Sequence, residues 1–196
     1  MQLKQAIAPL FDTVSRWVTL SELTRHALLD IASLHTVARK SLLEEPGRIS
    51  MHRNYIVMGL FRSYFMDDRG KEHTVQIAPE DHFTSDFQSY ILRQPSNLYV
   101  EALEESTIVQ FHYDAIEPLI REHLDLCEYF RRTTERAFAT SRERALSNLY
   151  MNAEERYNAL IDRFPHYEQR IPQRILASYL GITPEAFSRM KAARSQ

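Results

Sequence analysis

The stretch from Gln173 to Ala192 reads QRILASYLGITPEAFSRMKA, and it decides the fold at the C-terminal end of the chain. Two short helices that cross at a wide angle need a small residue where they touch, and Ala177 provides one. Gly181, four residues later, provides a backbone that tolerates positive φ at the corner. The apolar residues at helical spacing, which we expect to point inward, are Leu176, Leu180, Ile182, Phe187 and Met190. The stretch therefore predicts two helices packed around a tight turn.

The second helix of this pair has its own start signal. Thr183 can accept a hydrogen bond from a backbone N–H of the first turn, and Pro184 suits the first helical position. The pattern is that of a helix-turn-helix, whose second helix enters the major groove of DNA with its early turns. Arg189 suits a guanine and Glu185 suits a cytosine amino group. The expected DNA-binding residues are Thr183, Glu185, Ser188, Arg189, Lys191 and Arg174.

Charge supports this interpretation, although a short helical hairpin can show Ala-xxx-Gly with apolar flanks without binding DNA. Basic residues outnumber acidic ones in the terminal segment, which favours contact with phosphate groups. The basic residues are Arg163, Arg170, Arg174, Arg189, Lys191 and Arg194, and the acidic ones are Asp162, Glu168 and Glu185.

The totals describe an ordinary globular protein of 196 residues, with 44% hydrophobic and 26% charged residues. The formal net charge of -2 gives no general affinity for polyanions, so nucleic-acid binding has to come from a local patch. The single cysteine, Cys127, excludes an intramolecular disulfide and a four-thiolate iron-sulfur cluster within one chain. With no export signal and no run of about 20 apolar residues, we expect a cytoplasmic protein that does not cross a membrane.

The N-terminal stretch from Leu3 to about Lys40 predicts helices. Leu23, Ala27 and Ile31 recur at helical spacing, with Leu34 continuing the series, and Ser21 can cap the helix that follows Leu20.

Between Leu42 and Phe111 the pattern changes to short runs rich in aromatic and branched residues, which predict strands. These runs are 55–57, 60–66, 74–77 and 108–111. Asp67, Asp68, Arg69 and Gly70 predict a turn, and hence a hairpin whose second strand begins near Glu72. Many short strands in one block indicate a barrel or jelly roll.

A family resemblance appears at this point. YIVMG at 55–59 and DDRGKEHTVQIAPED at 67–81 resemble the cyclic-nucleotide-binding β-roll of the Crp/Fnr family of bacterial transcription regulators. Together with the helix-turn-helix, the resemblance covers nearly the whole chain. It implies an α+β fold with N-terminal helices, an antiparallel jelly-roll-like β-roll, a long dimerisation helix and a C-terminal helix-turn-helix. The implied domains are a sensor at 1–114, the dimerisation helix at 115–150 and the DNA-binding domain at 151–196.

The resemblance also locates an effector pocket, although the chain departs from the family there. Nucleotide-binding members hold the cyclic phosphate with a Gly-Glu pair and an Arg-Ser or Arg-Thr pair, and this chain has Thr84-Ser85 and Ser96-Asn97 at those places. A buried phosphate without its cation would be poorly compensated, so we do not expect cyclic AMP to bind through the usual contacts. The candidate pocket residues are Phe83, Thr84, Ser85, Asp86, Arg93, Ser96, Asn97 and Tyr99. Alternatively, the aromatic residues here, with Phe87 and Tyr90, simply fill the interior of the roll.

From Ala115 to about Tyr150 the chain predicts one long helix. A seven-residue repeat runs through it, which is typical of a coiled-coil seam. The repeat consists of Ile116, His123, Phe130 and Ala137, with Leu119, Leu126, Thr133 and Thr140 three positions on. In the family this helix pairs two subunits, so the resemblance implies a homodimer that binds a palindromic duplex. The alternative is an amphipathic helix packed on its own β-roll. After the recognition helix too few residues follow for the family's usual β-hairpin wing, so we expect a short member of the family.

No pattern in the sequence predicts catalysis or a metal site. The eight histidines form no pair at metal-ligand spacing, and there is no G-x-S-x-G elbow or glycine-rich phosphate loop. We therefore predict neither an enzyme nor a resident cofactor, with a haem ligated by a histidine or by Cys127 as a minor alternative. Two functions remain: a DNA-binding regulator with an unidentified effector, or a ligand-binding or protein-interaction module that keeps the fold without reading DNA.

Overall fold

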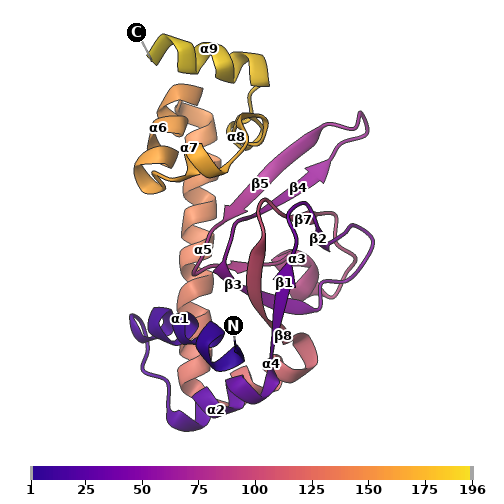
Figure 1. The fold of residues 1–196 in the computed structure, drawn as a ribbon, viewed down its shortest axis with the longest axis vertical. Coiled ribbons are helices and arrows are strands. Elements are labelled where there is room, and N and C mark those ends of the chain that lie inside the picture. The colour runs from indigo at the N-terminus through magenta and orange to yellow at the C-terminus, as the bar shows by residue number, and fades with distance from the viewer. Residues whose placement is uncertain (1, 195–196) are drawn as a thin grey trace. The chain divides into compact units, whose positions relative to one another are not determined.

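A computed structural model describes residues 2–194 (Figure 1). The chain divides into two compact units. The first contains residues up to Tyr64 together with Gln76–Glu135, and the second contains Phe65–Val75 together with the residues from Arg136 onward.

Within residues 2–194, two antiparallel sheets of four strands each form a roll, and most of it lies in the first unit. One sheet has the order β1-β8-β3-β6, with β1 Ala32–Val37, β8 Ser106–His112, β3 His52–Met58 and β6 Phe83–Thr84. The other has the order β2-β7-β4-β5, with β2 Leu42–Glu44, β7 Tyr99–Ala102, β4 Phe61–Met66 and β5 Glu72–Ala78. Strands that pair with partners distant in the chain, such as β1 with β8, make this the predicted β-roll.

The first sheet lies between two apolar layers. On one face Tyr55, Val109 and Phe111 pack against helices α1 Leu3–Ser15, α2 Glu22–Ile31, α4 Tyr113–Glu122 and the first turns of α5 Leu124–Tyr150. On the other face Ile56 and Ile108 pack against residues of the second sheet. The short helix α3 Phe87–Leu92 connects β6 to β7.

The prediction of helices in the N-terminal stretch was right in part. The helices expected within Leu3 to Lys40 form, and Ser21 caps α2 by accepting a hydrogen bond from the backbone N–H of Thr24 at 3.1 Å. The prediction was wrong for β1, where Leu34 faces Val109 of β8 instead of continuing a helix. Pairing with a strand more than seventy residues away overrides the local helical spacing there.

The expected single helix from Ala115 to Tyr150 is interrupted. His123 is extended (φ -109, ψ 104) and separates α4 from α5. Its Nδ1 lies 2.9 Å from the Thr24 hydroxyl, which also donates to the Asp125 carboxylate at 2.9 Å. Tertiary contacts with α2 therefore hold the break.

The residues of the predicted coiled-coil seam differ in their surroundings. Ile116, Leu126 and Phe130 are buried in the core of their own unit, which matches the alternative of a helix packed on its own roll. Beyond them Ala137 is exposed on α5.

The second unit contains the tip of the β4–β5 hairpin, the remainder of α5 and the terminal helices. The turn forms as predicted: the Asp67 N–H donates to the Lys71 carbonyl at 3.0 Å, and β5 begins at Glu72. The terminal helices are α6 Ala153–Arg163, α7 Tyr167–Arg170, α8 Gln173–Leu180 and α9 Pro184–Arg194. Together these elements confirm the predicted α+β fold class.

Gly59 is a position where the roll requires glycine. Its φ is +115, and a Cβ added there would lie 2.8 Å from the Cα of Ser106, which is closer than such atoms approach. Its N–H donates to the Glu80 carboxylate at 3.0 Å, so the backbone cannot easily turn away.

We expect Gly59→Ala to destabilise the protein by about 2 to 5 kcal/mol, because it combines backbone strain with overpacking. Chemical denaturation measures this change. Gly47→Ala is the matched control, because Gly47 also has positive φ (+86) but open space around it, and should cost only about 1 to 2 kcal/mol. Equal losses for the two variants would contradict the steric account.

Candidate nucleic-acid interface and effector cavity

The corner between α8 and α9 forms as the sequence predicts. Gly181 is left-handed (φ 72), and the N–H groups of Ile182 and Gly181 donate to the carbonyls of Ala177 and Ser178 at 3.0 and 3.1 Å. This pair of bonds is the Schellman arrangement that ends a helix. Ala177 is fully buried.

Helix α9 starts and packs as expected. The Thr183 hydroxyl accepts a hydrogen bond from the Ala186 N–H at 3.2 Å, and Pro184 is the first helical residue. Phe187 is fully buried, and its ring meets that of Tyr157 on α6 edge to face, with centroids 5.4 Å apart. Because Phe187 points inward, the opposite face of α9 is turned outward.

The structure brings the predicted reading residues to that outer face. Glu185, Ser188 and Arg189 are exposed. Glu185 accepts hydrogen bonds from its own backbone N–H and from Thr183, and Arg189 lies nearby; all three lower the pKa of Glu185. At neutral pH the side chains therefore present a carboxylate and a guanidinium one helical turn apart.

The other three predicted DNA-binding residues have different surroundings. Thr183 is exposed, but its hydroxyl already caps α9. Arg174 is exposed near the start of α8. Lys191 is half-buried and forms an ion pair with Glu168 of α7.

The predicted effector residues lie in the first unit, in surroundings that differ from one residue to the next. Some of them are packed. Phe83 lies against Tyr55 and Phe130, with ring centroids 5.4 and 5.7 Å away, and Tyr99 stacks on Tyr64 at 5.0 Å.

Other predicted effector residues make hydrogen bonds within the protein or face solvent. Thr84 is fully buried, and Ser85 donates to the His52 carbonyl at 2.6 Å. Arg93 donates to the Ser50 carbonyl at 3.1 Å, and Asn97 is exposed.

Asp86 and Ser96 belong to a buried polar network that the sequence did not reveal. Asp86 caps α3 by accepting from Gln88 and Ser89 N–H groups at 3.1 and 3.2 Å, and it accepts from the Ser96 hydroxyl at 2.7 Å. Its own N–H donates to Glu44 at 2.8 Å.

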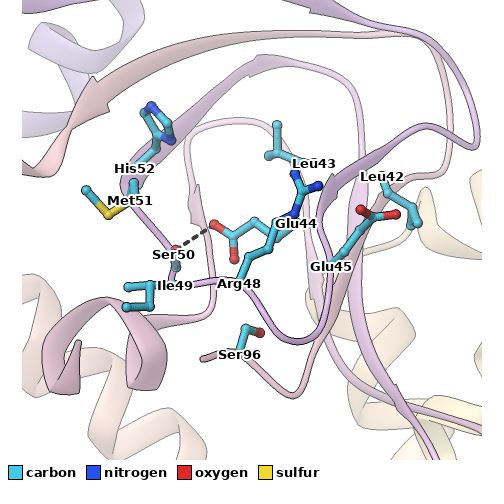
Figure 2. A pocket seen from close by; sticks show the side chains of 10 residues that line it. All are labelled: Leu42, Leu43, Glu44, Glu45, Arg48, Ile49, Ser50, Met51, His52 and Ser96. Carbon is cyan, nitrogen blue, oxygen red and sulfur yellow. Dashed lines mark hydrogen bonds between the residues drawn. The ribbon is translucent and has the colours of Figure 1, made fainter. Parts of the chain in front are cut away.

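Glu44 lies at the centre of this network. Its carboxylate also accepts from the Ser50 hydroxyl at 2.7 Å, as Figure 2 shows. Burial is the largest influence on this group and raises the pKa of Glu44.

A cavity of about 260 Å³ lies beside Glu44 (Figure 2). Of the predicted effector residues, Ser96 is the one that lines it. The other lining residues are Leu42, Leu43, Glu44, Glu45, Arg48, Ile49, Ser50, Met51 and His52. Apolar side chains and a few polar groups in a concave site are typical of small-molecule pockets, but this volume is below their usual range of about 300 to 1,000 Å³.

One feature of the sequence could have located this site. Glu44 follows two leucines in a strand-like run and precedes Pro46-Gly47, so a carboxylate sits where a strand enters a turn. Asp86, whose N–H donates to this carboxylate, is distant in the chain.

Comparisons with known proteins identify the fold. FixK2 from Bradyrhizobium japonicum superposes with a TM-score of 0.69 at 15% identity, covering 83% of this chain and 84% of that one. A protein from Eubacterium rectale described as a transcriptional regulator of the Crp/Fnr family gives 0.70 at 14% identity, covering 90% and 84%. The chain has the fold of the Crp/Fnr regulators.

A third structure with the Crp/Fnr fold is the c-di-GMP-responsive global regulator CLP of Xanthomonas campestris, with a TM-score of 0.65 at 15% identity, covering 89% of this chain and 92% of that one. No protein-family model and no curated protein sequence matches the chain. Within residues 2–194 no helix has the length and apolar character needed to cross a bilayer. In the same residues, no three side chains of the metal-binding types are grouped to hold an ion.

The raised pKa of Glu44 predicts how the stability of the fold depends on pH. A carboxyl whose pKa is raised by folding favours the fold most at pH values below its ordinary 4.5, and this contribution is lost as the pH rises through the folded-state pKa. We therefore expect the stability of the wild type, relative to Glu44→Gln, to fall as the pH rises from about 4.5.

Thermal unfolding from pH 4.5 upward measures this difference. Glu45→Gln, at an exposed neighbour, is the control for losing one negative charge. A difference between wild type and Glu44→Gln that stays flat or rises with pH would show that folding does not raise the pKa of Glu44.

Proposed function

We propose that the chain is a sequence-specific DNA-binding transcription regulator of the Crp/Fnr type. The observation that carries the proposal is the outer face of α9, where Glu185, Ser188 and Arg189 are exposed while Phe187 anchors the helix from behind. In this proposal residues 1–114 form the sensor domain, residues 115–150 form the dimerisation helix and residues 151–196 form the DNA-binding domain.

The chemistry of α9 suits the major groove. A guanidinium can donate two hydrogen bonds to O6 and N7 of guanine, and a carboxylate can accept from the cytosine amino group. Arg174 of α8 and Lys191 of α9 supply further positive charge, which suits phosphate contacts that position the helix without reading sequence. Lys191 can do so when its pairing with Glu168 is released.

The partner in this proposal is a second copy of the chain. Leu124 (84% exposed) and Phe138 (70%) are two heptads apart on α5, so they lie on one face of the helix. Leu149 (82%) continues the exposed apolar surface toward the C-terminal end. In such a homodimer on a two-fold operator, we expect the two reading helices to lie about 34 Å apart, one turn of DNA.

The cavity beside Glu44 is the effector site that we propose. Its lining has two carboxylates, Glu44 and Glu45, and one guanidinium, Arg48, which is exposed at the rim. Asp86 adds a further carboxylate to the network behind Glu44. A cyclic phosphate would meet this negative charge, so a small neutral or amine-bearing effector fits better.

Selection of random duplexes with the purified protein tests the function. Enrichment of an inverted repeat supports a dimeric regulator. If no sequence is enriched at modest salt, the proposal fails in favour of a ligand-binding or protein-interaction module with the same fold.

Substitutions on α9 test the reading residues. Arg189→Ala and Glu185→Ala should each weaken binding to the selected duplex by about 1 to 3 kcal/mol and relax base preference at one position. Fluorescence anisotropy against single-base variants of the duplex measures both effects.

The matched control is Arg39→Ala, which removes an exposed positive charge from the first unit. Affinity and base preference that stay the same in all three variants would rule out these reading roles.

The dimer is tested on α5. We expect Phe138→Glu to shift the protein to monomers, because the glutamate would be buried without a partner at the interface. Sedimentation equilibrium measures the shift. Ala139→Glu places the same charge on an adjacent, exposed position of another helix face and should leave the dimer intact. Equal effects of the two variants would argue against this face.

A further inference from the structure

The C-terminal end of α8 is held by two arginines from other helices. An α-helix leaves its last four carbonyls without partners inside the helix. In α8 two of them accept from the corner itself, and the other two accept from arginines. The Tyr179 carbonyl accepts from Arg144 of α5 at 3.1 Å, and the Leu180 carbonyl accepts from Arg156 of α6 at 2.8 Å.

Arg144 also binds the β4–β5 hairpin. Its guanidinium donates to the carbonyls of Thr74, at 3.2 Å, and Val75. It lies over the Tyr179 ring, 3.9 Å from the centroid. One planar group thus joins α5, the hairpin and α8, which the fixed fork of arginine donors allows and a lysine would not.

Ser178 ties α8 to the same hairpin independently of Arg144. Its hydroxyl accepts from the Thr74 N–H at 2.9 Å and donates to the Glu72 carbonyl at 2.9 Å. Both of these backbone groups belong to β5, so the Ser178 side chain bonds α8 directly to this strand.

We infer that Arg144 is a positioning residue for DNA reading, which sets the orientation of α8 and α9 on the end of α5, with Ser178 holding the hairpin side of the same joint. In a dimer that pairs through α5, this orientation fixes the distance between the two reading helices. It therefore determines which spacing of half-sites the protein accepts. The inference rests on the proposed function.

The physical reason is that half-site spacing is a strict geometric readout. Adding one base pair moves a half-site by about 3.4 Å along the duplex and turns it by about 35°. If several charge-assisted hydrogen bonds hold α8 and α9 in place, the two helices cannot adjust to such a shift. If those bonds are removed, they can.

The experiment uses the full-length protein and a series of duplexes with identical inverted half-sites, whose spacers differ by single base pairs. For the wild type we expect one spacing to bind at least about 10-fold more tightly than its neighbours. Arg144→Gln and Ser178→Ala should reduce that preference to about 3-fold or less. Their affinity for a single half-site should stay within about 3-fold of the wild type, because the face of α9 is unchanged.

Arg142→Ala is the matched control, since Arg142 is an exposed arginine two positions before Arg144 on the same helix. It should keep the wild-type spacing preference. Ser178→Ala removes only a hydroxyl, so it tests the joint even when the Arg144 variant does not fold.

Two results would overturn the inference. One is an unchanged spacing preference in Ser178→Ala and in folded Arg144→Gln. The other is an equal loss of affinity for every spacing and for the single half-site, which would make the joint merely structural. A wild type that binds none of the duplexes would instead refute the proposed function.

Discussion

The contact between α8 and α9 at Ala177 and Gly181 is the constraint on which the rest of this structure's function depends. The corner closes because a small residue is buried at the crossing and a left-handed glycine turns the chain. Every last carbonyl of α8 then finds a donor, so the corner is satisfied as well as tight. Without it, the outer face of α9 would have no fixed direction.

The first unit shows how one fold can hold different chemistry. The β-roll has the Crp/Fnr architecture, but the segment after β6 is occupied by a helix cap and a network of buried hydrogen bonds around Glu44 and Asp86. Arg93, the cation of this segment, donates to a backbone carbonyl and lies over Tyr113. The carboxylates of Glu44 and Asp86 accept hydrogen bonds from serine hydroxyls and backbone amides, so the fold alone does not identify an effector.

Local signals made the C-terminal pair, the β4–β5 turn and the cap of α2 predictable. Ser21, for example, accepts from the Thr24 N–H in the first turn of α2, as its position before the helix suggested. The strand β1 and the break at His123 were not predictable, because they depend on β8 and on Thr24, both distant in the chain. The hydrogen bond from the Asp86 N–H to Glu44 likewise joins residues that are distant in the chain.

The most direct measurement is a structure of the protein bound to its selected duplex. The account requires α9 in the major groove, with the Arg189 guanidinium and the Glu185 carboxylate at hydrogen-bonding distance from base edges. A duplex bound elsewhere on the protein, or an α9 whose outer face points away from the groove, would contradict it.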